Sequence, residues 1–158
     1  MSFRERSLGT TLIMAVLFSI FGAAFLWAQG DIDQSQDNDP ASLIGMTLDE
    51  LLNRFGTPRS VYAVRGLEEW QDDVVFVYDH GDFYVFKDRV WQLGLKEAWG
   101  IKAGDSQPVV SLVLGSKSEY RQNSIFYSLD DRSWPLMLRC DFSSDAKLQV
   151  IFIYRTDF

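Results

Sequence analysis

The chain has 158 residues and a formal net charge of −7, and 47% of its residues are hydrophobic, 15% aromatic and 23% charged. This apolar content excludes a disordered or low-complexity chain, because such chains are too poor in apolar side chains to offset the entropy lost on folding. The acidic balance argues against a nucleic-acid partner, since neutralising phosphates needs clustered Lys and Arg.

The first 30 residues have the pattern of an export segment. Two arginines precede a run without charges from Leu8 to Trp27. As a helix this run would rise roughly 30 Å, enough to cross a membrane. Ala28 and Gly30 also provide the small residues that signal peptidase requires before a cut. Residues 1–30 are therefore predicted to be a signal peptide or an uncleaved signal anchor, and the positive-inside rule places the rest outside the cytoplasm.

Residues 31–42 are rich in Asp and Gln and are predicted to form an acidic, disordered linker. A short helix should follow from Leu48 to Phe55. Thr47 and Glu50 have the spacing of a capping box at its start, and Gly56 supplies a residue that can end it.

Alternating and β-branched residues then predict three antiparallel strands at 74–78, 83–86 and 90–95, with an edge strand at 61–67. The same order recurs at an offset of 59 residues, since Gly45 corresponds to Gly104 and Gly56 to Gly115. Strand-like runs follow again at 125–129, 135–142 and 148–154.

The predicted fold class is therefore α+β. It consists of two tandem units, each a short helix plus an antiparallel β-meander, that share one core after an N-terminal apolar helix. Because each unit is too small to be stable alone, a shared core or a continuous sheet is expected. The first unit spans residues 43–101 and the second, more divergent unit spans residues 102–158.

The first unit resembles a known family. Gly45-Met46-Thr47, the Phe55-Gly56 pair and the aromatic-rich meander are similar to the BamE (SmpA/OmlA) domain, and the tandem arrangement resembles that of the β-lactamase-inhibitor-like proteins. The resemblance implies a unit that binds other proteins of the bacterial envelope and has no catalytic site. The chain lacks the lipoprotein cysteine of BamE.

A search for catalytic and metal-ligating patterns predicts no catalytic residue, no metal site and no cofactor. The one histidine, His80, lies between Asp79 and Gly81, where a metal or proton-transfer role competes with a His80-Gly81 hairpin turn, which is favoured. Cys140, the one cysteine, lies in an apolar run and is predicted to be a buried thiol. The chain is therefore predicted not to be an enzyme.

Two-residue turns at His80-Gly81 and Asp88-Arg89 would sort the meander into two faces. An apolar face of Val75, Val77, Tyr84, Phe86, Trp91, Leu93 and Leu95 would lie under the helices. The other face would present Phe76, Tyr78 and Phe83 to a partner, unless it is covered within the molecule.

These inferences predict an extracytoplasmic, non-catalytic protein-interaction module, an adaptor or inhibitor of the bacterial cell envelope. The domain would be periplasmic, or anchored in the inner membrane through residues 1–30 if these are uncleaved. The expected partner is an envelope protein, and no nucleic acid is expected. The alternative is a small-ligand or lipid-binding envelope protein with an apolar pocket between helices and sheet.

Overall fold

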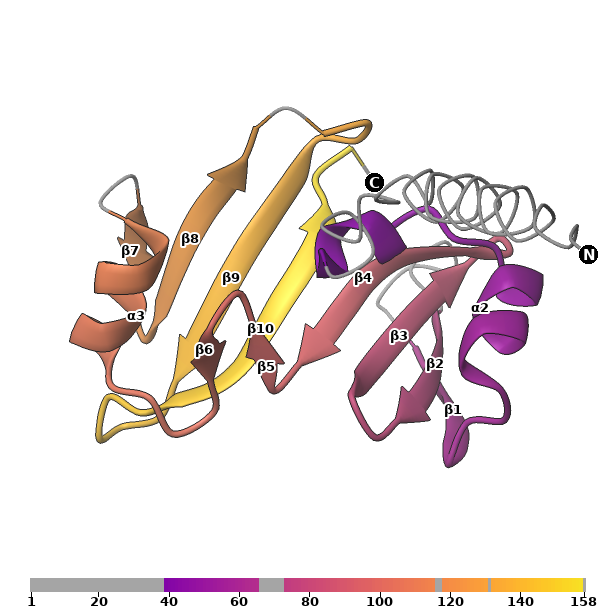
Figure 1. Cartoon of the computed structure of the whole chain (residues 1–158), viewed down its shortest axis with the longest axis horizontal. Coiled ribbons are helices and arrows are strands. Elements are labelled where there is room, and N and C mark those ends of the chain that lie inside the picture. Colours follow the sequence, from indigo (N-terminus) through magenta and orange to yellow (C-terminus); the bar gives the residue numbers. More distant parts are fainter. Residues whose placement is uncertain (1–38, 66–72, 116–117, 131, 158) are drawn as a thin grey trace, which may run out of the picture. The chain divides into compact units, whose positions relative to one another are not determined.

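The computed structural model describes residues 39–65, 73–115, 118–130 and 132–157 (Figure 1). These residues fall within one compact unit, Gln36–Phe158. Its elements in chain order are η1 Pro40–Leu43, α2 Leu48–Phe55, β1 Ser60–Val64, β2 Asp73–Tyr78, β3 Gly81–Phe86, β4 Arg89–Leu95, β5 Glu97–Ala98, β6 Ile101–Lys102, α3 Gln107–Leu114, β7 Glu119–Arg121, β8 Ser124–Leu129, β9 Leu136–Phe142 and β10 Leu148–Arg155.

One antiparallel sheet of eight strands dominates the described residues, in the order β1-β2-β3-β4-β10-β9-β8-β7. Strands β4 and β10 join the two halves of the chain, with Leu95 opposite Ile151 and Leu93 opposite Ile153. The predicted fold class, α+β in two tandem helix-plus-meander units, is therefore wrong. The fold is mainly β, because the last strands of the two halves pair with each other and merge the expected meanders into one sheet.

The helix ends follow from local sequence. Thr47 caps α2 by accepting a hydrogen bond from the backbone N–H of Glu50 at 3.2 Å, and the Glu50 carboxylate accepts from the Thr47 N–H at 2.8 Å. Gly56 ends the helix with φ of 73°. The predicted helix and its capping box are confirmed. Ser106 precedes α3 but makes no side-chain capping hydrogen bond.

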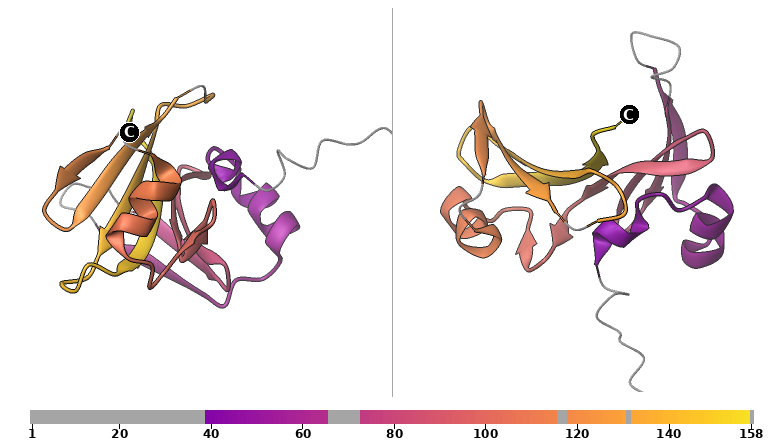
Figure 2. Two further views of the ribbon diagram at one scale, coloured as in Figure 1. Left: turned by 60° about the vertical axis from the view of Figure 1, so that its left-hand side comes forward. Right: turned by 90° about the horizontal axis from the view of Figure 1, so that it is seen from above.

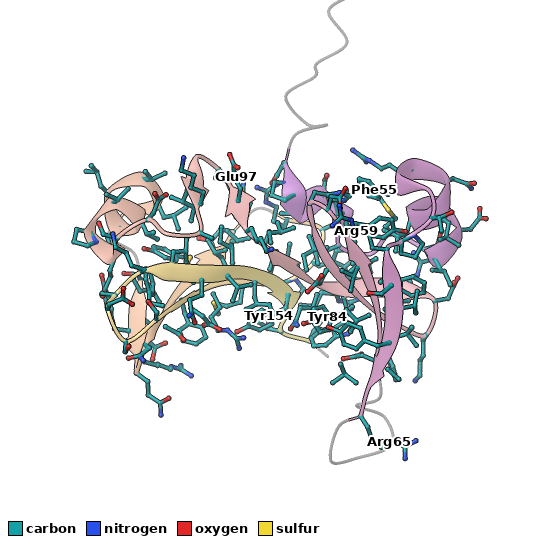
Figure 3. The ribbon with its side chains drawn as sticks, turned by 90° about the horizontal axis from the view of Figure 1, so that it is seen from below. Phe55, Arg59, Arg65, Tyr84, Glu97 and Tyr154 are labelled. Carbon is teal, nitrogen blue, oxygen red and sulfur yellow. The ribbon has the colours of Figure 1, made fainter. Side chains whose placement is uncertain are left out.

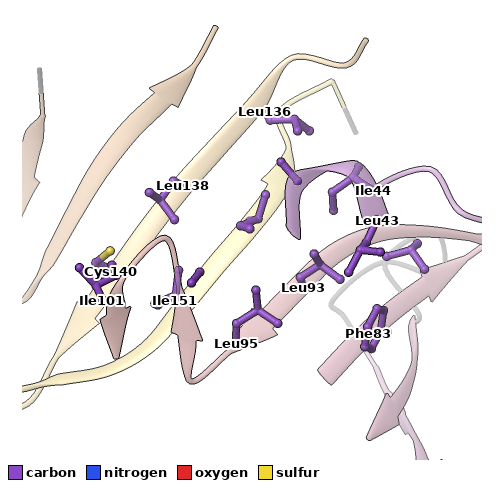
Figure 4. Close-up of a cluster of buried hydrophobic side chains, with 14 of the residues drawn as sticks. Leu43, Ile44, Phe83, Leu93, Leu95, Ile101, Leu136, Leu138, Cys140 and Ile151 are labelled. Carbon is purple, nitrogen blue, oxygen red and sulfur yellow. The ribbon is translucent and has the colours of Figure 1, made fainter. Parts of the chain in front are cut away.

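Helices α2 and α3, η1 and the β5–β6 hairpin all lie on one side of the sheet, which we call the helix face (Figure 2). A single cluster of buried side chains fills the space between them and the sheet. It draws on both halves of the chain, including Leu43, Phe83, Leu93, Leu138, Cys140 and Ile151 (Figure 4). The two halves therefore share one core.

Further contacts tie the start of the domain to residues much later in the chain. Asp39 accepts a hydrogen bond from Trp99 Nε1 at 3.2 Å and pairs with Arg132. Gly45 has φ of 90°, and a Cβ there would lie 2.7 Å from the indole nitrogen of Trp134. The predicted disordered linker, 31–42, consequently extends too far, because η1 begins at Pro40 and Ala41 is buried.

The register of the hairpins differs from the prediction. The two turns are Asp79-His80 and Lys87-Asp88, so Phe83 lies opposite Phe76 and Arg89 lies opposite Phe86. The backbone angle φ is positive at both Lys87 (46°) and Asp88 (65°), as in the two-residue hairpin turns whose twist matches that of the strands.

A register shift between Tyr84 and Val85 then changes the pairing along β4. Residues Leu93 and Leu95 consequently share the helix face with Phe83, although the sequence analysis placed them on the opposite face from it. The predicted position of Leu93 and Leu95 under the helices is confirmed. The predicted assignment of faces is wrong for β2 and β3, because their Phe76, Tyr78 and Phe83 also lie under the helix.

Candidate interaction surface on the open face of the sheet

The side of the sheet opposite the helices carries no other described element, and we call it the open face. Burial alternates strictly along β3 and β9, where helix-face side chains are buried and open-face side chains are half-buried. This is the period of two that a strand imposes when one side is packed and the other is left accessible. The sheet curves so that β1 and β7 rise on this side (Figures 2 and 3).

Three tyrosines form a row across the open face. Strand pairing aligns Tyr62, Val75, Tyr84, Gln92 and Tyr154 on the consecutive strands β1, β2, β3, β4 and β10. The tyrosines thus occupy alternate strands, about 10 Å apart, since neighbouring strands are spaced by about 5 Å. Tyr84 and Tyr154 both point away from the helices (Figure 3). We call Tyr62, Tyr84 and Tyr154 the tyrosine row.

Charged and aromatic side chains flank one side of this row. A second row of residues is displaced from the tyrosine row by two positions along each strand. It contains Asp82, Gly94, Phe152 and Arg139, which lie opposite one another on β3, β4, β10 and β9. The Arg139 guanidinium lies 4.4 Å from the centre of the Phe152 ring, which is within the range of a cation–π contact. Arg139 also pairs with Asp141, at 3.1 Å between Nε and Oδ1.

The other side of the row holds an indole and a carboxylate. Trp91 donates a hydrogen bond from Nε1 to Oδ1 of Asp73 at 2.8 Å, which fixes the large indole ring beside the meander. The open face therefore combines aromatic side chains with hydrogen-bonding groups that carry positive and negative charges.

The pKa of the Tyr84 hydroxyl is affected by groups on several neighbouring strands. Partial burial raises its pKa above the ordinary value, and Tyr62, Asp82 and Asp73 raise it further, whereas Arg139 lowers it. Partial burial also raises the pKa of the Asp82 carboxyl, with Lys96 acting in the opposite direction. The phenol of Tyr84 is consequently neutral near neutral pH and can both donate and accept hydrogen bonds.

The residues predicted to bind a partner lie on the helix face instead. Phe76, Tyr78 and Phe83 are 9%, 7% and 0% exposed and belong to the core cluster. The ring of Phe55 from α2 packs 5.3 Å from that of Phe83, and Tyr78 donates a hydrogen bond from its hydroxyl to the Gly56 carbonyl at 3.0 Å. Their prediction as exposed binding residues is wrong, because α2 covers this side of the meander.

Sequence reasoning missed the tyrosine row as a surface. Tyr84 was assigned to the covered face, Tyr62 was placed only in an edge strand, and Tyr154 only in the last strand. A usable signal was present in the alternation of large apolar residues with Tyr, Gln and Asp along the strands, but the faces cannot be assigned until the helix is placed.

The residues considered for chemistry lie in structural positions. His80 is part of the first hairpin turn, and its ring packs 4.5 Å from that of Phe55. Its pKa is lowered by partial burial, against the opposing effect of Asp79. Cys140 is fully buried, and burial raises the pKa of its thiol to about 12. Among the described residues, no group of three His, Cys, Asp or Glu side chains could hold a metal ion.

The predicted signal peptide or anchor, residues 1–30, lies outside the described residues, as does most of the predicted linker. Within the part of the chain that the structure describes, no helix has the length and apolarity needed to span a membrane.

No family model matches the chain, and a search of curated proteins also finds no match. Among solved structures, the chain is similar to a 1.5 Å crystal structure of an extracellular protein containing an SCP domain from Bacillus anthracis strain Ames. The identity is 14% and the TM-score 0.50, and the match covers 82% of this chain and 49% of that one. The chain thus spans about half the length of that protein, and the likeness concerns the fold alone. The resemblance to BamE domains stays a prediction.

Proposed function

We propose that this chain is an extracytoplasmic, non-catalytic protein-interaction module whose open face contacts the partner. The observation that carries the proposal is the tyrosine row on a curved sheet face that no described element covers. Tyrosine offers a large, rigid contact area together with a hydroxyl, and Tyr, Trp and Arg dominate the binding energy of protein interfaces. Trp91 and Arg139 flank the row on the same face.

The proposed location is the bacterial cell envelope, in the periplasm or anchored in the inner membrane. Its support is the export pattern of residues 1–30 and the BamE-like motif around Thr47. The structurally similar Bacillus anthracis protein is described as extracellular, which agrees with a location outside the cytoplasm. The partner we propose is another protein of the envelope.

A small-ligand or lipid-binding role is the alternative, and it needs space between the helices and the sheet. There Leu51, Phe83 and Val110 are each 0% exposed and pack within one core cluster. This packing favours the interaction module over a pocket on the helix face.

The test is photo-crosslinking of the full chain in its native cells. A benzophenone amino acid is placed at Tyr84 or Tyr154 and, as a control, at Leu112, which is 83% exposed on α3. We expect a discrete protein adduct from both open-face positions and none from Leu112. Adducts from Leu112 alone, or no protein adduct from either tyrosine position, would contradict the proposal.

A second measurement separates binding from folding. Once the crosslinked partner is identified, Tyr154→Ala should lower its affinity by about thirtyfold, the equivalent of about 2 kcal/mol for a hot-spot residue. Leu112→Ala should leave the affinity unchanged. Circular-dichroism melts of both variants show whether each still folds.

A further inference from the structure

Asp82 is a carboxylate of the open face that lacks an ion-pair partner. It precedes Phe83, whose side chain lies on the helix face, so Asp82 shares the open face with Tyr84 and is half-buried there. Among the described residues, its side chain forms no ion pair and accepts no hydrogen bond. Partial burial of an uncompensated charge is unfavourable, so this carboxylate does not serve the fold.

Aromatic side chains lie on two sides of Asp82. Gly94 is opposite Asp82 on β4, and Phe152 is opposite Gly94 on β10. A Cβ at Gly94 would lie 3.3 Å from Cε1 of the Phe152 ring and 3.7 Å from Cβ of Asp82. Because Gly94 has no side chain, the Phe152 ring and the Asp82 side chain approach each other above it. Tyr84, two positions along β3, provides the second ring.

Three arginines in the second half of the chain show what such a combination holds. Each forms an ion pair with an acidic residue two positions away in the chain and also lies over an aromatic ring. The guanidinium carbons lie 5.3, 4.4 and 3.9 Å from the ring centres, within the range of cation–π contacts. The three sets are Arg121, Glu119 and Phe126; Arg139, Asp141 and Phe152; and Arg155, Asp157 and Trp134.

Asp82 has the carboxylate and the rings of such a set but not the arginine. The residues two positions away in the chain are His80 and Tyr84. Arg139, in the same row of the sheet, lies three strands from Asp82, which is about 15 Å at the usual strand spacing. It is held there by Asp141 and Phe152. Lys96 lowers the pKa of the Asp82 carboxyl but forms no ion pair with it.

The charge of the whole chain favours a basic occupant at this position. With a formal charge of −7, the chain attracts positively charged surfaces and repels acidic ones. Arginine suits the surroundings better than lysine, because its planar guanidinium can donate two parallel hydrogen bonds to a carboxylate and stack on a ring.

We propose that Asp82, flanked by Tyr84 and Phe152, binds an arginine side chain of the partner protein. The inference rests on the proposed function, because this arginine belongs to the protein that covers the tyrosine row. The guanidinium donates hydrogen bonds to the Asp82 carboxylate and lies against the neighbouring rings. It completes on the open face the set that Arg121, Arg139 and Arg155 complete within the chain.

The first test adds charge variants to the crosslinking of the full chain in its native cells, with the benzophenone amino acid at Tyr154. Asp82→Asn removes the charge and Asp82→Lys reverses it. Glu97→Gln and Glu97→Lys make the same changes of net charge at an exposed carboxylate of β5, on the helix side of the sheet (Figure 3). We expect Asp82→Asn to reduce the protein adduct, Asp82→Lys to abolish it and both Glu97 variants to leave it unchanged. Equal effects at the two positions, or a full adduct with Asp82→Lys, would overturn the proposal.

The second test identifies the arginine by a double-mutant cycle with the purified partner. Mass spectrometry locates the crosslinked peptide of the partner, and each arginine near it is replaced by Gln. Against the unchanged partner, Asp82→Asn should weaken binding about tenfold or more, equivalent to 1.4 kcal/mol. Against the variant that lacks the contacting arginine, Asp82→Asn should have almost no further effect. Losses that add fully for every arginine tested would overturn the proposal.

Melting temperatures separate recognition from folding. Because Asp82→Asn removes a half-buried charge without an ion pair, the variant should melt no lower than the wild type. A clearly lower melting temperature would show that the carboxylate supports the fold and would overturn its assignment to the partner.

The outcomes also distinguish this inference from the proposed function. If Tyr84 and Tyr154 capture a protein whose binding does not depend on Asp82, the arginine site is wrong and the interaction face stands. If neither position captures a protein, the proposed function fails and the arginine site fails with it.

Discussion

Thr47 and Ser106 precede the two helices at corresponding positions but make different contacts. The Thr47 hydroxyl accepts a hydrogen bond from the Glu50 N–H, whereas Ser106 makes no side-chain capping bond. Thr47→Ala should therefore lower the free energy of unfolding by about 1 kcal/mol, the usual cost of a lost cap. Ser106→Ala should cost clearly less. Urea unfolding of both variants measures this, and equal losses would contradict the capping assignment.

The pH dependence of this cap follows from Glu50. Its pKa is lowered by hydrogen bonds from the Thr47 backbone N–H and then from the Thr47 hydroxyl. A carboxyl whose pKa is lower in the folded state stabilises the fold above its unfolded pKa, and this contribution is lost as the pH falls through the folded pKa. The stability difference between the wild type and Glu50→Gln should therefore shrink on acidification, because the Gln side chain does not titrate. Unfolding experiments at neutral and strongly acidic pH test this, and a constant difference would exclude the carboxylate from the cap.

At the scale of the element, local signals located the helices and most strands correctly. The capping box and the glycine that ends α2 act within a few residues, so the bounds of Leu48–Phe55 could be predicted. Strand positions were also predictable, because alternating β-branched residues mark them. The register was not, since a two-residue turn at Lys87-Asp88 and one at Asp88-Arg89 have similar local sequences. Strand β7 was missed because three largely charged residues carry no strand pattern.

The assignment of faces depends on tertiary packing, which local patterns do not contain. Both faces of the meander carry aromatic residues, so apolarity alone could not show which face α2 covers. The sequence analysis therefore located the correct strands but assigned their accessible aromatic face to the wrong side of the sheet. The contact of Phe55 with Phe83 settles the question in the structure.

Adjacent residues of β3 provide a direct test of the faces. Phe83 is 0% exposed on the helix face, whereas Tyr84 is half-buried on the open face. Phe83→Ala should lower the free energy of unfolding by about 3–5 kcal/mol, as expected for a buried aromatic truncation. Tyr84→Ala should cost much less. Thermal and urea unfolding of the two variants gives the comparison, and the reverse order would restore the faces predicted from the sequence.

At the scale of the whole described unit, stability comes from one core that spans both halves of the chain. The β4–β10 pairing places Leu93 and Leu95 against Ile153 and Ile151, so neither half can lose its packing without exposing apolar residues of the other. The likeness in sequence between the halves predicted neighbouring units with a shared core or a continuous sheet. It did not identify which strands would pair, because that pairing joins residues far apart in the chain.

This shared core predicts a single cooperative unfolding transition. Leu138 of β9 is 1% exposed and lies in the second half, whereas β3 lies in the first half. Leu138→Ala should lower the free energy of unfolding by about 2–5 kcal/mol. If the halves unfold together, the protection of β3 amides against hydrogen exchange should fall by the same free energy as that of β9 amides. Native-state hydrogen exchange resolved by NMR measures both strands in one sample. Retained protection in β3 with loss confined to β8–β10 would show that the halves unfold separately, in spite of the continuous sheet.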